Sequence, residues 1–258
     1  MATTATGSDL TEQHRRAQLA LRSAFMRELV RLWPLINLDD LDETAAEWIG
    51  VVTDLILAYR TQSVDKALSY YDSFRRAETG RPLPNRGNYR SLAVPNLASI
   101  KTSLLVTGPF GVKSRIGKGI NPRTAKAKAL VDVSGAASRH VLNGGRQLVT
   151  EAVAKDKVAL GFARVTDADP CAFCAMLASR GPVYRSRESA GTRRVAGESE
   201  LHRYHDHCAC QVEAVYSKDA EWPGRAREFE QLWKDSTKGK RDALKAFREA
   251  YEAQRKSK

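Results

Sequence analysis

Cys171-Ala-Phe-Cys174 and His205-Asp-His-Cys208-Ala-Cys210 are the two stretches that decide how the second half of this 258-residue chain folds. They contain all four cysteines and two of the five histidines. A Cys-x2-Cys turn directs two thiolates at one ion about 2.3 Å away, and a second knuckle from a distant segment completes the tetrahedron. The spacing therefore predicts a structural zinc site that joins two remote pieces of backbone.

More candidate ligands are present than one tetrahedral site needs. The best placed are Cys171, Cys174, His205, Cys208 and Cys210. They combine as four cysteines, or as three cysteines with His205 in place of Cys210, and we favour a mixed site in which one of these two residues is spare. His202 and His207 are weaker candidates. Disulfides, free thiols and an iron–sulfur cluster remain alternatives. The N-terminal residues lack the basic and apolar regions of a secretory signal, which favours a reducing compartment and metal over disulfides.

The segments that flank the knuckles alternate between apolar and polar residues. Residues 160–165 lead into the first knuckle and residues 210–216 leave the second. Alternation over this length is typical of short strands. We expect the two strands to pair antiparallel, with the metal at one end of the small sheet.

The first eighty residues show a helical period instead. Leu21, Phe25 and Leu29 recur until Pro34, and a second series from Trp48 to Tyr59 follows an acidic entry. Such spacing predicts an antiparallel helical pair, with Ser8 or Asp9 as the first N-cap. Asn121-Pro122 opens another helix, which Gly144-Gly145 is expected to break or kink.

These patterns predict a mainly helical α+β protein with a small antiparallel sheet. Residues 79–121 contain many prolines and glycines and are expected to be rich in loops. We divide the chain into a helical region 1–78, a basic connecting region 79–121, a zinc-binding domain 122–216 and a basic helical tail 217–258. No apolar run approaches the roughly 20 residues that span a bilayer, so no membrane contact is expected.

The formal charge of +12 favours polyanionic partners, and double-stranded DNA is the first candidate. No acidic residue occurs from position 79 to position 131. The predicted non-specific phosphate contacts are Lys101, Lys113, Arg115, Lys118, Arg123, Lys126 and Lys128. The arginine-rich segment 180–204 is a surface loop by default and a second candidate for phosphate contact.

The arrangement of the knuckle residues resembles that of the phage Mu F-like minor capsid and head-morphogenesis proteins. It runs from Asp169-Pro-Cys171-Ala-Phe-Cys174-Ala-Met-Leu177 through Gly181 and Tyr184 to His205-Asp-His-Cys208-Ala-Cys210-Gln-Val-Glu213. The resemblance covers about residues 120–216. Asp206 and Ala209 depart from the proline and arginine that are frequent in the family, and the connecting loop is longer.

The resemblance has several implications. It implies a virion protein, present in the host cytoplasm during assembly, that contacts the portal protein, the major capsid protein and packaged DNA. The sequence form looks most like the branch found in phages of actinobacteria, where similar proteins are also called capsid maturation proteases.

Motifs for hydrolytic catalysis are missing from the sequence. It contains no His-Glu-x2-His and no Gly-x-Ser-x-Gly, and His140, with Ser134 and Ser138 nearby, is expected to be structural. A zinc site filled by cysteines leaves no position for a reactive water. We therefore predict no catalytic residues. If the protein is an enzyme, a capsid maturation protease is the expected activity, and a zinc-stabilised nucleic-acid-binding module is the third reading.

Overall fold

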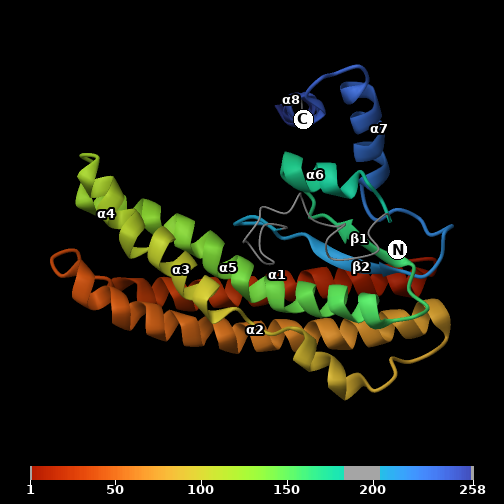
Figure 1. The fold of residues 1–258 in the computed structure, drawn as a ribbon, viewed down its shortest axis with the longest axis horizontal. Coiled ribbons are helices and arrows are strands. Elements are labelled where there is room, and N and C mark those ends of the chain that lie inside the picture. The colour runs from red at the N-terminus through yellow and green to blue at the C-terminus, as the bar shows by residue number, and fades with distance from the viewer. Residues whose placement is uncertain (1, 183–203, 257–258) are drawn as a thin grey trace.

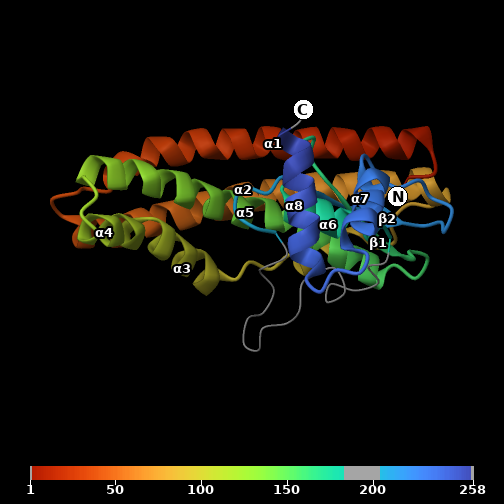
Figure 2. The ribbon, with the colours of Figure 1, turned by 90° about the horizontal axis from the view of Figure 1, so that it is seen from above.

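The computed structural model describes residues 2–182 and 204–256. Three long helices, α1 (Ala5–Leu32), α2 (Leu41–Thr79) and α5 (Pro122–Lys155), lie side by side along the long axis of the molecule (Figures 1 and 2). Their contact is apolar: Phe25, Trp48 and Val133 are fully buried in one cluster. The short helix η1 (Trp33–Leu35) ends α1 at Pro34, as predicted.

The predicted start of the first helix was wrong. Helix α1 begins at Ala5, and the hydroxyl of Thr4 accepts a hydrogen bond from the Gly7 amide at 2.9 Å. The carboxylate of Glu78, at the end of α2, accepts further hydrogen bonds from the amides and hydroxyls of Thr3 and Thr4. A tertiary contact therefore begins the helix one turn before the local cap signal at Ser8.

The loop-rich reading of residues 79–121 also needs correction. This stretch forms η2 (Arg86–Leu92) and two helices, α3 (Leu97–Thr107) and α4 (Pro109–Gly117), which pack on α5. Pro109 occupies the first turn of α4, where its missing N–H costs nothing. Prolines and glycines thus mark the helix boundaries here instead of excluding helices.

Gly144 and Gly145 do not break α5. The helix runs through them, and each lies where α2 crosses closely. A Cβ at Gly144 would lie 2.7 Å from Cγ of Arg60 and 2.8 Å from its carbonyl oxygen, while a Cβ at Gly145 would lie 3.0 Å from the carbonyl oxygen of Ser63. The glycine pair therefore permits a close helix crossing.

A two-stranded sheet lies against one end of this bundle. Strand β1 (Gly161–Val165) pairs antiparallel with β2 (Gln211–Val215), with Val165 opposite Gln211. This confirms the predicted α+β class, mainly helical with a small antiparallel sheet. The sheet shares an apolar core with the ends of α2 and α5, and that core includes Cys174, Cys208 and Cys210.

The remaining helices form a separate layer over the sheet (Figure 1). Helix α6 (Ala172–Ala178) packs against α7 (Ala226–Thr237) and α8 (Ala243–Lys256) through Phe229, Phe247 and Tyr251. The predicted helical tail thus anchors the first knuckle, because the Tyr251 hydroxyl donates to the carbonyl oxygen of Pro170. None of the described helices has the length and hydropathy that a membrane span requires.

Candidate metal centre

The first knuckle is the N-terminus of helix α6. Cys171 is its N-cap, and its Sγ accepts a hydrogen bond from the backbone amide of Cys174 at 3.4 Å. Cys174 follows one turn later and is 1% exposed. The Cys-x2-Cys spacing therefore places both sulfur atoms at the same helix end, where the exposed amides favour negative charge.

The second knuckle is a tight turn held against one face of α5. The amide of Cys208 donates to the carbonyl oxygen of His205 at 3.2 Å. Arg139 of α5 binds the carboxylate of Asp206 at 2.7 Å, and Arg146, two turns later on the same face, binds the carbonyl oxygens of Cys208 and Cys210 at 2.7 and 2.9 Å. Two arginines of one helix thus fix the position of this turn.

His207 lies against α5 and outside the ligand groups of the described residues. Its backbone is left-handed, with φ of 65°. A Cβ built on Gly135 would lie 2.5 Å from Nε2 of the His207 ring. Gly135 therefore makes room for the second knuckle on α5. The weaker candidate His202 falls outside the described residues, as do Tyr184 and most of the arginine-rich segment.

The two knuckles bring their sulfur and nitrogen atoms together at the end of the sheet. Two overlapping groups, Cys171–Cys174–His205 and Cys174–Cys208–Cys210, each have their potential ligand atoms within 4.8 Å of one another. Cys174 belongs to both groups, so all five predicted ligands converge around it. The cluster is compatible with a metal ion.

Two of the distances between donor atoms are close to those of a tetrahedral zinc site. Zinc–sulfur bonds of about 2.3 Å and zinc–nitrogen bonds of about 2.0 Å place neighbouring ligand atoms roughly 3.5 to 3.8 Å apart. Sγ of Cys174 lies 3.4 Å from Sγ of Cys208 and 3.6 Å from Nε2 of His205. The contact of 2.8 Å between Cys171 and His205 is shorter and is a hydrogen bond. All four cysteines are free, so the disulfide alternative is not present in this structure.

The orientation of His205 suits metal binding. Its Nδ1 donates to the carbonyl oxygen of Asp206 at 2.6 Å, which leaves Nε2 facing Cys171 and Cys174. A second hydrogen bond of this kind fixes the tautomer of many metal-binding histidines. The hydrogen bond with Cys171 raises the pKa of His205 to about 9. Hydrogen bonds with Cys174 and His205 lower the pKa of Cys171 to about 4.

Two buried arginines lie near the cysteines. The guanidinium carbons of Arg146 and Arg164 lie 3.9 and 4.1 Å from the centre of the Tyr204 ring, and both side chains are almost fully buried. Hydrogen bonds from Cys174 and Cys210 lower the pKa of Cys208, and the two guanidinium charges lower it further. A zinc ion bound by three or four thiolates would carry a net negative charge, which two nearby cations would offset. The sequence analysis did not identify Arg146, Arg164 or Tyr204, because basic residues within apolar stretches have no distinctive spacing.

The predicted DNA contacts fall into two groups. Lys113 pairs with Asp42, Arg115 pairs with Asp132, and Lys126 donates to the carbonyl oxygen of Ile36. These three cations are therefore engaged within the fold. The other four, which are exposed and have no ion pair among the described residues, are Lys101, Lys118, Arg123 and Lys128.

His140 makes a hydrogen bond to a serine that the sequence analysis did not single out. Its Nε2 lies 2.9 Å from Oγ of Ser103 on α3. The side chain is only 3% exposed, and burial, with the charges of Arg139 and Arg60, lowers its pKa to about 3. The hydrogen bond joins α5 to α3. Ser134 and Ser138 are buried in α5, and the Ser138 hydroxyl contacts the sulfur of Met26.

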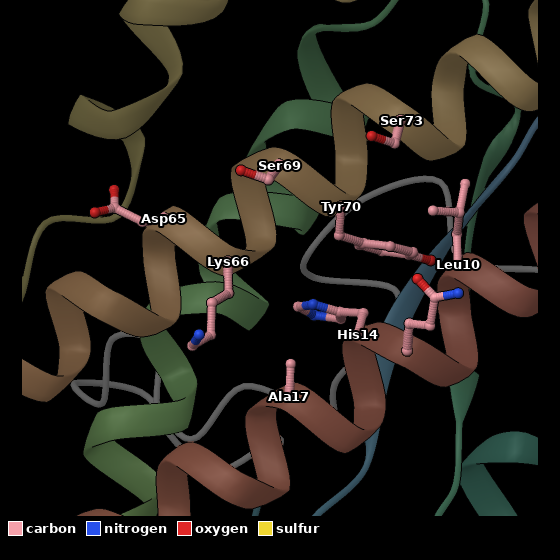
Figure 3. A pocket seen from close by; sticks show the side chains of 9 residues that line it. Leu10, His14, Ala17, Asp65, Lys66, Ser69, Tyr70 and Ser73 are labelled. Carbon is pink, nitrogen blue, oxygen red and sulfur yellow. The ribbon is translucent and has the colours of Figure 1, made fainter.

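A groove of about 430 Å³ lies between α1 and α2, away from the cysteines (Figure 3). His14 extends across it from α1, and its ring is stacked on Tyr70 with the centroids 4.3 Å apart. Burial lowers the pKa of His14 to about 3, so the imidazole is neutral at pH 7. None of the residues singled out in the sequence as site candidates lines this groove.

The chain is similar in sequence to proteins of two mycobacteriophages. The chain is 27% identical over 222 residues to the Gene 15 protein of Mycobacterium phage D29, a match that covers 75% of this chain and 76% of the phage protein. It is 25% identical over 224 residues to the Gene 15 protein of Mycobacterium phage L5, covering 72% of each. No solved structure is significantly similar. The VG15 protein family matches residues 5–236, from the start of α1 through the knuckles to α7, and the chain belongs to that family.

Proposed function

We propose that the protein is a minor capsid protein of the Mu F-like kind, which acts in phage head morphogenesis and is carried in the virion. The single observation that carries the proposal is the convergence of Cys171, Cys174, His205, Cys208 and Cys210 on one site, because the resemblance rests on these residues. Membership of a family with relatives in two mycobacteriophages supports a phage role. The proposed partners are the portal protein, the major capsid protein and packaged DNA, with assembly in the host cytoplasm.

Coexpression with the other head proteins of the same phage tests this role. The chain is produced with the portal, scaffold and major capsid proteins, and purified heads are examined by mass spectrometry. A few intact copies per head are expected. Absence of the chain from heads that otherwise assemble would contradict the proposal.

The site is proposed to hold a structural zinc ion through Cys171, Cys174, His205 and Cys208. His205 is chosen because its Nδ1 hydrogen bond leaves Nε2 facing the first knuckle. In this assignment Cys210 is the spare group beside the site. The zinc would crosslink α6 to the start of β2 and supply folding free energy, with the four protein ligands closing the site to water.

Native mass spectrometry of the purified chain tests the ligand assignment. We expect one zinc ion per wild-type chain, loss of zinc and a lower melting temperature in Cys171→Ser and Cys208→Ser, and retained zinc in the matched control Cys210→Ser. A wild-type mass equal to that of the bare polypeptide would exclude the metal. Zinc retained by His205→Gln but lost by Cys210→Ser would assign the site to the four cysteines.

Packaged DNA is proposed to contact the exposed cations at the start of α5. Each phosphate contact adds about 0.9 to the slope of log K against log salt concentration. Replacing Lys118, Arg123 and Lys128 together with Gln is expected to reduce that slope by about 2 to 3. The control Arg115→Gln is expected to leave it unchanged, because Arg115 is paired with Asp132. Equal slopes for both variants would remove this surface from the proposal.

A capsid maturation protease is the second candidate, because Ser103 and His140 form the hydrogen bond that a nucleophile and its base require. Burial of His140 and two neighbouring arginines oppose its protonation, which a catalytic base must undergo. The coexpression experiment separates the two roles by intact mass. Cleaved capsid protein that disappears with Ser103→Ala in a normally folded chain would favour the protease.

A further inference from the structure

Exposed apolar side chains are concentrated in the segment that leads from the start of α3 through α4 into the first part of α5. Of the thirteen large hydrophobic residues that are exposed among those described, seven lie between positions 94 and 131: Val94, Leu97, Leu105, Val106, Phe110, Ile116 and Val131. Single exposed apolar residues are normal, but a concentration of them marks an interaction surface. Helix α4 lies at the end of the bundle opposite the sheet (Figure 1), but α3 comes closer to the second knuckle, because Ser103 and the carboxylate of Asp206 both contact the guanidinium of Arg139.

On helix α3, the exposed residues of this surface are regularly spaced along one face. Leu97, Lys101 and Leu105 are spaced four residues apart, so they lie on one face, and all three are exposed. We call these three residues the α3 stripe. Phe110, 58% exposed, begins α4 just beyond the stripe. Gly108 fixes the turn between the two helices, since a Cβ there would lie 2.6 Å from the carbonyl oxygen of Leu104.

Helix α2 presents a complementary face at the same end. Glu43, Glu47 and Val51 are also spaced four residues apart and exposed, and we call them the α2 stripe. Neither glutamate has an ion pair among the described residues. The ion pair between Asp42 and Lys113 joins the start of α2 to α4, and both views show these segments at one end of the molecule (Figures 1 and 2).

We propose that two copies of the chain associate through this end about a two-fold axis, with the α3 stripe of each copy lying against the α2 stripe of the other. A two-fold axis that passes between two adjacent, complementary patches brings each patch onto its complement in the other copy. Lys101, in the middle of its stripe, then faces Glu47, and one of the two leucines faces Val51. Apolar contacts beside paired charges of opposite sign give such a contact both burial and electrostatic complementarity.

The composition of the surface favours a second copy over DNA. Lys101 would suit a phosphate, but the exposed leucines and Phe110 would gain nothing from the backbone of a duplex. Glu43 and Glu47 would repel it. A second copy would offer a carboxylate to Lys101, a cation to the glutamates and apolar surface to the exposed hydrophobic side chains. This inference does not depend on the proposed role in the phage head.

Light scattering of the purified full-length chain between about 1 and 100 µM tests the proposal, because dimer formation follows mass action. The wild type is expected to reach the mass of two chains. Lys101→Glu and the double variant Glu43→Lys/Glu47→Lys are each expected to stay monomeric, since like charges then meet at both contacts. An equimolar mixture of the two variants is expected to regain the dimer mass, because opposite charges face each other again.

The mixture distinguishes the interface from a folding defect, since two misfolded chains would not restore each other. Phe110→Asp is expected to weaken the dimer at least tenfold, and its matched control Leu244→Asp, at 55% exposure on α8, is expected to have no effect. A wild type that is monomeric throughout the range would overturn the proposal, and duplex binding by that monomer would assign the surface to DNA. A mixture that stays monomeric would overturn it equally.

Discussion

Arg146 should be the most important single side chain for the stability of the cysteine site. Arg146 is 2% exposed, and its guanidinium donates to the carbonyl oxygens of Cys208 and Cys210 and stacks on Tyr204. Arg146→Met keeps much of the side-chain volume but leaves both carbonyl oxygens without this donor. Hydrogen bonds from a charged group contribute about 1.5 to 3 kcal/mol each, and removing the burial cost of the charge offsets part of that loss. The expected loss is therefore about 3 kcal/mol of the free energy of unfolding.

Urea unfolding followed by circular dichroism measures this loss. The matched control is Arg139→Met, two turns earlier on the same face of α5, whose ion pair with Asp206 is partly exposed. Partly exposed pairs contribute about 0.5 to 1 kcal/mol. If both variants lose the same amount, the reasoning that the buried carbonyl contacts dominate is wrong. Arg146→Met should also release the proposed zinc ion at a lower chelator concentration, because one of the two compensating charges is lost.

The remaining predictions concern the bundle. Burial favours the protonated form of Asp156, but hydrogen bonds from Arg75 and its neighbours outweigh this and hold its pKa below the ordinary value of 3.8. The carboxylate thus stabilises the fold above that value and less as pH falls through the lowered pKa. Asp156→Asn should cost about 3 kcal/mol at pH 7 and less in acid, and equal losses in chemical unfolding at pH 7 and pH 2.5 would contradict this. Gly144→Ala should lower the free energy of unfolding by about 1 to 3 kcal/mol, because the new methyl group overlaps Arg60. Gly50 has open space around it, so Gly50→Ala should raise the free energy of unfolding by about 0.5 to 1 kcal/mol. Differential scanning calorimetry tests the sign of both changes.

Local patterns were reliable where a short stretch fixes its own geometry. The Cys171–Cys174 spacing predicted a knuckle that the structure forms as the N-terminus of α6, and Asn121-Pro122 predicted the start of α5. The two strands pair as expected, since their alternation needed only one partner. These features depend on residues three or four apart, or on one face of a strand, and the sequence contains that information directly.

The tertiary structure decided what depended on partners far along the chain. The carboxylate of Glu78 shifts the start of α1, the close crossing of α2 explains Gly144 and Gly145, and Asp42 pairs with Lys113 from a position 71 residues earlier in the chain. In the sequence, Arg146 cannot be distinguished from any other helical arginine. Its role comes from the second knuckle, which lies more than sixty positions later in the chain and packs against it. The sequence by itself determined which atoms could bind a metal. Only the packing of α5 against the knuckles decided how those atoms are held, because that contact joins segments with no fixed spacing between them.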